Sequence, residues 1–207
     1  VIPNPLSFYP DESAALQNKT VIAVGKQGIQ KGYDRLLDSW KIVHEKNPDW
    51  HLKIFGSFDA SQKLESQAKD LNIDSTVHFF EPVKNIEKQF LESSIFVFSS
   101  RFEGFGMVLI EAMACGVPCI SFDCPCGPSE IINDLEDGFL VPNGNIKLFA
   151  SKINQLIAQQ DLRLKMGKNA KENVKRYLPK KIIPQWDLLF KSLSKGSKVQ
   201  SLKRFKV

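Results

Sequence analysis

The amino-acid sequence predicts an α/β fold with a doubly wound parallel sheet. Two observations support this prediction: runs of four to five apolar residues alternate with segments of helical periodicity, and these runs contain few polar residues. Strands that consist almost entirely of Val, Ile and Phe are buried on both sides, as in a parallel sheet covered by helices on both faces. Because such sheets bind ligands outside the carboxyl ends of their strands, we expect chemistry in the loops that follow strands.

Six strands are expected, one for each apolar run. The first two runs, residues 21–24 and 52–55, are each followed by a glycine, which is common where a chain leaves a strand. The other four strands are expected at residues 77–80, 95–98, 119–122 and 139–141.

Helical periodicity fills the segments between these strands. In residues 33–46 apolar side chains recur every three to four positions, and Pro48 stops the helix. From residue 146 to about residue 193 the pattern is again helical, with breaks near Asp161 and Pro179. Further helices are expected at residues 61–71, 86–91 and 105–114 and, as a single turn, at residues 129–133.

The composition is that of a globular protein of 207 residues, with 43% hydrophobic and 25% charged residues. These values exclude a disordered chain, a collagen-like chain and a small disulfide-bonded scaffold. No apolar run reaches the roughly 18 residues of a membrane span, and no signal peptide is recognisable. The first residue is Val1 rather than Met, so we expect this chain to be cut from a longer one.

Charge is unevenly distributed along the chain. Residues 1–160 contain 14 basic and 20 acidic residues, whereas residues 161–207 contain 14 basic and 3 acidic ones. A basic end attracts nucleic acid or anionic lipid, and the alternative is a solvated helix face followed by a frayed end. We expect residues 195–207 to form a disordered basic tail.

Four cysteines, Cys115, Cys119, Cys124 and Cys126, lie within twelve residues. Their spacing contains no C-x2-C pair, and no histidine is nearby, so it does not match a zinc site. We expect reduced thiols in a cytosolic chain, with a metal or redox role as the alternative.

Three loops that follow strands contain candidate functional residues. The first, residues 25–32, contains Lys26 and Lys31 among three glycines. Cations in a loop that precedes a helix suit a phosphate or diphosphate. The residue order is neither that of a P-loop nor G-x-G-x-x-G, and an ordinary exposed turn is the alternative.

The second loop, residues 99–106, leads into an apolar helix and includes one of two carboxylates. Glu103 precedes the helix, and Glu111 lies two turns inside it at about 1.5 Å rise per residue. A carboxylate in so apolar a helix needs hydrogen-bond donors, which ligand hydroxyls would supply. Gly104 and Gly106 leave the N–H groups at the helix start open to an anion. The alternative is a capping Glu103 and a Glu111 that is paired with Lys or Arg.

The third loop, residues 123–130, has a fixed path because it contains two prolines and a glycine. Ser129 and Glu130 open a helical turn whose amides could face an anion. Glu130 is equally well explained as a carboxylate that only stabilises the start of the helix.

Taken together, these segments resemble a known enzyme family. Residues 99–118 (SSRFEGFGMVLIEAMACGVP) and the following GPSEII strongly resemble retaining glycosyltransferases of family 4, with Glu103 and Glu111 in the two positions of the E-x7-E signature. Other segments also match the family, and all occur in the family's order along the chain. They are VGK and KG in the first loop, DGFLVP from Asp137, and the helix at residues 162–177. Residues 2–5 resemble the hinge segment before the second domain.

The resemblance implies a single Rossmann-like domain, the C-terminal half of a two-domain GT-B enzyme. Residues 1–18 would be the hinge and residues 19–194 the nucleotide-sugar-binding domain. The missing N-terminal domain would bind a polysaccharide, lipid-linked or other glycan acceptor, to which a hexosyl or N-acetylhexosaminyl group is transferred. The alternative is a stand-alone nucleotide-sugar-binding subunit that needs a separate acceptor-domain partner.

The resemblance also implies roles for individual residues. Lys26 and Lys31 would neutralise the donor diphosphate, and Glu103 would hold sugar hydroxyls, so these three form the expected catalytic set. Glu111 would accept hydrogen bonds from the ribose hydroxyls. The full donor site would consist of Gly25, Lys26, Lys31, Phe80, Glu81, Val83, Glu103, Gly104, Phe105, Gly106, Met107, Val108 and Glu111.

Two of these residues depart from the family pattern, because Lys26 stands where arginine is usual and Glu81 where glycine is common. Enzymes of this type place cations and helix dipoles at the phosphates, so we expect no metal ion and no cofactor. The expected donor is a UDP-sugar, and no nucleic-acid partner is expected. The expected location is the cytoplasm, with peripheral association at the inner face of the membrane through the basic tail.

Overall fold

The computed structural model describes the backbone of residues 1–203 and the side chains of residues 1–194. Within this part, six parallel strands form one sheet in the order β3-β2-β1-β4-β5-β6, which is the order of Rossmann-type sheets. Each of the six predicted strands is confirmed to within one residue. The strands are β1 (Thr20–Val24), β2 (His51–Phe55), β3 (Val77–Phe80), β4 (Ile95–Phe98), β5 (Cys119–Asp123) and β6 (Gly138–Pro142).

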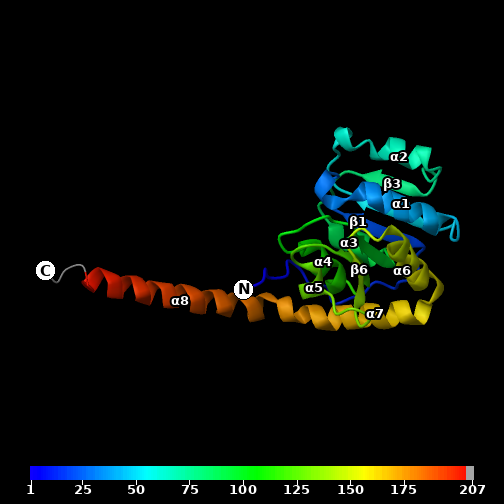
Figure 1. Ribbon diagram of the computed structural model, residues 1–207. Coiled ribbons are helices and arrows are strands. Elements are labelled where there is room, and N and C mark those ends of the chain that lie inside the picture. Colours follow the sequence, from blue (N-terminus) through cyan, green and yellow to red (C-terminus); the bar gives the residue numbers. More distant parts are fainter. Residues whose placement is uncertain (204–207) are drawn as a thin grey trace.

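Helices cover both faces of this sheet (Figure 1). One face packs against α1 (Tyr33–His44), α2 (Leu64–Asp70) and α6 (Ile146–Ala158). The other packs against α3 (Ile86–Leu91), α4 (Met107–Ala114), α5 (Pro128–Ile131) and the end of α7 (Gln160–Asn173). Successive strand residues therefore enter opposite core layers, which explains why the strands are apolar throughout.

Two predicted helices differ from the observed ones for local reasons. The expected helix at residues 61–71 is divided into a short 3-10 turn, η2 (Ala60–Gln62), and α2, because Lys63 between them has a left-handed backbone with φ of 49°. The helix expected from residue 105 begins instead at Met107, because Gly106 has a φ of 99°. Two further 3-10 turns are η1 (Ile29–Lys31) and η3 (Val174–Tyr177).

The N-terminal segment, residues 1–18, contains no helix or strand and packs on the domain. The Leu6 N–H donates to the carbonyl of Tyr177, and the Ala14 N–H donates to that of Cys115, both at 2.8 Å. Leu6 and Leu16 are buried in the same core layer as α4. These contacts bring the segment expected as a hinge against α4 and the end of α7.

Helix α8 (Pro179–Lys203) extends away from the body of the domain (Figure 1). It includes residues 195–203, for which the sequence predicts disorder, and residues 204–207 lie outside the described residues. In the described part of the chain, no helix is both long and apolar enough to cross a membrane.

The sheet has its topological switch point between β1 and β4. Strand β1 pairs with β2 on one side and with β4 on the other. The chain then passes from β1 to α1 on one face of the sheet and from β4 to α4 on the opposite face. Because the two connections diverge, they leave a crevice at the carboxyl ends of these strands, where doubly wound proteins bind ligands.

Candidate active site

The two connections at the switch point meet through an ion pair. Lys31, in η1 after β1, donates from Nζ to Glu103 Oε1, in the loop after β4, at 2.7 Å. The two side chains are only 18% and 8% exposed. The ammonium also lies 5.2 Å from the centroid of the Phe98 ring. Of the residues expected to act on the ligand, Lys31 and Glu103 are therefore brought into direct contact.

Gly25 provides the space in which the Lys31 side chain lies. Its φ is +150°, and a Cβ at this position would lie 2.7 Å from Lys31 Cε. The Gly25 carbonyl accepts a hydrogen bond from Tyr33 Oη at 3.2 Å. Burial raises the pKa of Tyr33, and the nearby Glu103 carboxylate raises it further, so this hydroxyl stays protonated and remains a donor. Lys26, next in the loop, is exposed.

The start of α4 is open in the way that the sequence predicts. Gly106 is the N-cap residue, and no side chain caps this end of the helix. Glu103 is engaged by Lys31 rather than by the helix, so the interpretation of Glu103 as a cap is wrong. Gly104 is exposed, and Met107 and Val108, in the first turn, are half-buried. This arrangement leaves backbone N–H groups beside the Lys31–Glu103 pair.

Glu111 lies deeper in α4 and contacts the N-terminal segment. Its Oε1 accepts a hydrogen bond from Ser7 Oγ at 2.8 Å. Burial raises the pKa of Glu111, and the Ser7 hydrogen bond opposes this effect. Among the described residues Glu111 has no ion pair, so the alternative of a partner Lys or Arg is also wrong. No hydrogen bond in the described part of the chain links Glu111 to Lys31 or Glu103.

A pocket of about 300 Å³ lies beside the first loop at the ends of β1 and β2. One wall is aromatic, because Phe55 stacks on Phe80 with ring centroids 4.7 Å apart. Glu81 is exposed in the same connection after β3. The pocket is lined by Val24, Gly25, Lys26, Phe55, Gly56, Ser57, Pro82, Val83 and Ile86. A mostly apolar slot that ends at a lysine fits a flat ring attached to an anionic group.

The third loop packs against the second. The Glu103 N–H donates to the Pro125 carbonyl at 3.1 Å, and a Cβ on Gly127 would lie 1.9 Å from the Phe105 carbonyl oxygen. Phe105 in turn packs edge-on against Tyr177, with ring centroids 5.6 Å apart. A second pocket, of about 520 Å³, is lined by residues 1–4, Gly104, Phe105, Cys126, Gly127, Glu130 and Tyr177.

The cysteines form no metal site in the part of the chain that the structure describes, where no group of three or more potential ligands lies together. Burial raises the pKa of Cys115 to about 12 and that of Cys124 to about 11. Thiols with such pKa values stay protonated at neutral pH and are poor nucleophiles and metal ligands.

Comparisons with known proteins show the family of this chain. The sequence pattern of the family described as "Glycosyl transferases group 1" matches residues 9–173. The chain belongs to this family. Similar proteins include the amylovoran biosynthesis glycosyltransferase AmsD of Erwinia amylovora, 38% identical over 184 residues, which are 89% of this chain and 51% of AmsD. An uncharacterized glycosyltransferase of Haemophilus influenzae is 36% identical over 186 residues, which are 89% of this chain and 53% of that protein.

The fold is also similar to that of a solved structure with bound ligands. A variant of TarM from S. aureus, in complex with Fondaparinux, alpha-GlcNAc-glycerol and UDP, superposes with a TM-score of 0.83 and 28% sequence identity. The match covers 91% of this chain and 38% of that one. This chain spans about half the length of the two curated relatives named above.

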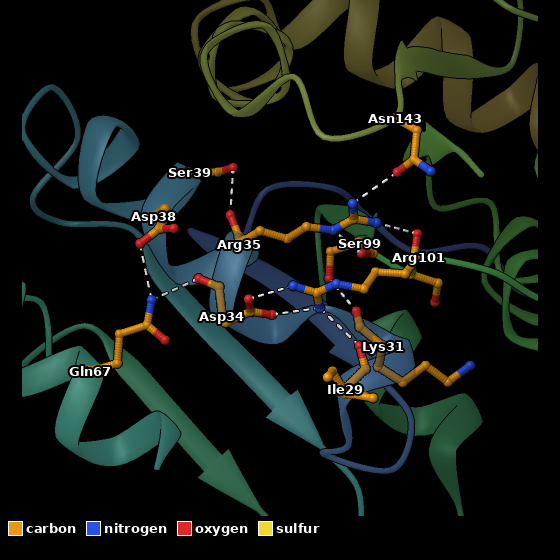
Figure 2. Close-up of polar contacts among 11 residues, drawn as sticks. Ile29, Lys31, Asp34, Arg35, Asp38, Ser39, Gln67, Ser99, Arg101 and Asn143 are labelled. Atoms are coloured by element: carbon orange, nitrogen blue, oxygen red, sulfur yellow. Dashed lines mark hydrogen bonds and ion pairs between the residues drawn. The ribbon is translucent and has the colours of Figure 1, made fainter. Parts of the chain in front are cut away.

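The candidate site of this glycosyl transferases group 1 domain also includes residues that the sequence analysis did not assign. Asp34 and Arg35 lie in the first turn of α1, and Arg101 lies two residues before Glu103; all three contact the first or second loop (Figure 2). Ser7 and Tyr33 complete the set. Arg101 lies within the recognised SSRFEGF run, but its partner Asp34 is 67 residues away, and no local periodicity indicates that contact.

Proposed function

We propose that this chain is the donor-binding half of a retaining glycosyltransferase of family 4 and that its donor is a UDP-sugar. The observation that supports the proposal most is the buried Lys31–Glu103 pair at the switch point, beside a flat pocket and an uncapped helix start. This combination offers sites for a base, a diphosphate and sugar hydroxyls at the same edge of the sheet. The acceptor, a polysaccharide, lipid-linked or other glycan, binds the other half of the enzyme.

The proposed reaction breaks the bond between the anomeric carbon and the diphosphate oxygen. Lys31 and Lys26 stabilise the charge that accumulates on the departing diphosphate, and the N–H groups at the start of α4 add to this effect. The acceptor oxygen forms the new bond to the anomeric carbon, its proton passes to an oxygen of the departing diphosphate, and the nucleoside diphosphate leaves. Glu103 orients the sugar by accepting hydrogen bonds from its hydroxyls.

The nucleoside occupies the remaining part of the crevice. Its base lies against Val83 and Phe55 in the 300 Å³ pocket. Its ribose hydroxyls donate to Glu111, which exchanges its Ser7 partner for the ligand. A half-buried carboxylate with one weak donor gains from this exchange, because added hydrogen bonds stabilise its charged form.

The similarity to TarM supports both the nucleotide and the stereochemistry. Its complex contains UDP together with an alpha-linked N-acetylglucosamine glycoside. A retaining enzyme converts an alpha-linked sugar donor into an alpha-linked product, and that glycoside has the same alpha configuration. The hexosyl or N-acetylhexosaminyl class of the donor sugar, the absence of a metal requirement and a cytoplasmic location at the inner membrane face are parts of the same proposal.

Calorimetry with the 207-residue chain tests donor binding. UDP is expected to bind more tightly than GDP or ADP, and to raise the temperature of unfolding because it binds only the folded state. Glu111→Ala is expected to weaken UDP binding about tenfold. Glu172→Ala removes an exposed carboxylate on α7 and is the matched control, with unchanged affinity. Absence of binding of all three nucleotides at millimolar concentration would overturn the proposal.

A further inference from the structure

Arg101 connects the two loops that carry Lys31 and Glu103. Its backbone N–H donates to the Gln30 carbonyl and its Nη1 donates to the Ile29 carbonyl, both at 2.8 Å. The same guanidinium forms a two-point contact with the Asp34 carboxylate, with distances of 2.8 and 2.6 Å. Arg101 therefore holds the residues immediately before Lys31 while it lies two positions before Glu103.

Arg35, from α1, holds the second loop. Its Nε donates to the Ser99 carbonyl at 2.9 Å and its Nη2 donates to the Ser100 carbonyl. Its Nη1 donates to Asn143 Oδ1 at 2.8 Å, in the connection after β6. The guanidinium also lies over the Phe122 ring, 4.4 Å from its centroid. Figure 2 shows the two arginines reaching in opposite directions, Arg35 from α1 toward Ser99 and Asn143, and Arg101 from the second loop toward Asp34.

The space between the two arginines is filled by the chain itself. Ser99 Oγ donates to the Lys31 carbonyl at 2.8 Å. Gly32 follows with a φ of +62°, and a Cβ there would lie 2.4 Å from the Ser99 carbonyl oxygen and 2.7 Å from Arg35 Nε. The first and second loops are thus in contact at the backbone, and a side chain at Gly32 would separate them.

We infer that Arg101 and Arg35, together with Asp34, are positioning residues that set the distance between the Lys31 ammonium and the Glu103 carboxylate. The inference rests on the proposed function, because it assigns to these residues the alignment of the diphosphate side of the site with the sugar side. Neither guanidinium is assigned a contact with the ligand. They donate to backbone carbonyls of the two loops and, in the case of Arg101, to the Asp34 carboxylate.

Energetic considerations favour a geometric role over a stabilising one. The Arg101–Asp34 pair is about one-third to two-fifths exposed, and exposed ion pairs stabilise a fold by less than about 1 kcal/mol. Its value lies in orientation, since a planar guanidinium with two-point contacts allows few alternative arrangements. Reaction rates and charge recognition are sensitive to displacements of about 1 Å, so a small gain in rigidity has a large effect on function.

The experiment compares Arg101→Gln with Arg163→Gln in the 207-residue chain. Arg163, a buried arginine in α7, is the matched control. Like Arg101, it donates to backbone carbonyls, including those of Leu16 and Ile157, but in the described part of the chain it has no hydrogen bond to the first or the second loop. Two quantities are measured for each variant: amide hydrogen exchange along the chain, and the affinities for UMP and UDP.

For Arg101→Gln we expect faster exchange confined to residues 25–32 and 99–106. We also expect about a tenfold loss of UDP affinity with UMP affinity within about twofold, because only the diphosphate reaches both loops. Arg163→Gln is expected to lower the unfolding temperature with the ratio of UMP to UDP affinity unchanged. Asp34→Asn should reproduce the Arg101→Gln result, and the double variant should add little to either.

Unchanged exchange in both loops, or equal losses of UMP and UDP affinity, would overturn the positioning role. The hydrogen-exchange measurement needs no ligand. If the unaltered chain binds neither nucleotide, the proposed function fails, and the exchange result by itself decides whether Arg101 holds the two loops. Rescue by Arg101→Lys would also contradict the inference, because an ammonium lacks the two-point contact.

Discussion

Two lysines in this domain are similarly withdrawn from solvent but differ in what their ammonium groups contact. Lys171, in α7, donates to the carbonyls of Asp11 and Glu12 and, at 3.0 Å, to Ser13 Oγ. Lys31 donates, among the described residues, only to Glu103. An ammonium has three donors, so Lys171 has used all of them within the fold and Lys31 retains two.

The difference is the one expected between a cation proposed to bind a ligand and a structural one. Burial lowers the pKa of Lys171, and its ammonium replaces lost water contacts with fixed acceptors of the N-terminal segment. Lys31 combines partial burial with unused donors and faces a crevice at the switch point. Both residues are lysines with little exposed surface, and the hydrogen-bond partners of the ammonium distinguish the two.

The largest expected effect that tests this comparison is on nucleotide affinity. Lys31→Met keeps an unbranched side chain of similar length but removes the ammonium, which lies over the Phe98 ring. We expect UDP affinity to fall by about 2 kcal/mol, roughly 30-fold, because a hydrogen bond to a charged phosphate is lost. Calorimetry measures this, with Lys175→Met, an exposed lysine paired with Glu172, as the control. Equal affinities of Lys31→Met and the unaltered chain would remove Lys31 from the site.

The same substitution at the other lysine is expected to act on folding instead. Lys171→Met leaves the carbonyls of Asp11 and Glu12 without their donor, so the free energy of unfolding should fall by about 1–2 kcal/mol. UDP affinity is expected to stay within about twofold of the original. Urea denaturation followed by calorimetry separates the two effects. A large loss of affinity without loss of stability would mean that the two lysines are not different in kind.

The smallest expected effect concerns Glu111 and pH. Because its pKa is raised in the folded state, this state binds the proton more tightly than the unfolded state does. The contribution of Glu111 to the free energy of unfolding therefore falls as pH rises from its pKa in the unfolded state to its pKa in the folded state. Above the folded-state pKa the carboxylate is charged in both states, and the destabilisation caused by its burial is complete. Glu111→Gln should be slightly more stable than the unaltered chain at pH 7.

This advantage should vanish below about pH 4, where both states of the unaltered chain are protonated. Urea denaturation between pH 4 and pH 8 measures it, with Glu172→Gln as the exposed control. Because loss of the carboxylate in Glu111→Ala is expected to weaken UDP binding, Glu111 would trade stability for ligand binding. A variant that is less stable than the unaltered chain at pH 7 contradicts the burial argument.

Much of the fold could be predicted because its signals are local. The apolar run at residues 95–98 and the glycine after residue 24 identify strands from neighbouring residues alone. Element ends were less accurate where one residue adopts an unusual backbone, as Lys63 does between η2 and α2. The limits of the hinge and of the basic tail stay predictions.

Part of the candidate site could also be predicted, because its residues lie in segments that local sequence signals identify. Lys31, Glu103 and Glu111 lie in loops and helices that the sequence identifies, and a resemblance in motif order supplied their expected roles. Their partners could not be predicted: the Ser7–Glu111 contact joins residues 104 positions apart, and no pattern over a few residues carries that information. The two arginines were missed for the same reason.

The sequence by itself determined the order of strands and helices, the loops with lysines and carboxylates, and the apolar helix in which Glu111 lies. The tertiary structure alone decided which of these groups meet. Periodicity reports contacts within about four residues along a helix or two along a strand, whereas the Lys31–Glu103 pair depends on β1 and β4 being neighbours in the sheet. That neighbour relation arises from the burial of the whole sheet between two helix layers, which no single segment specifies.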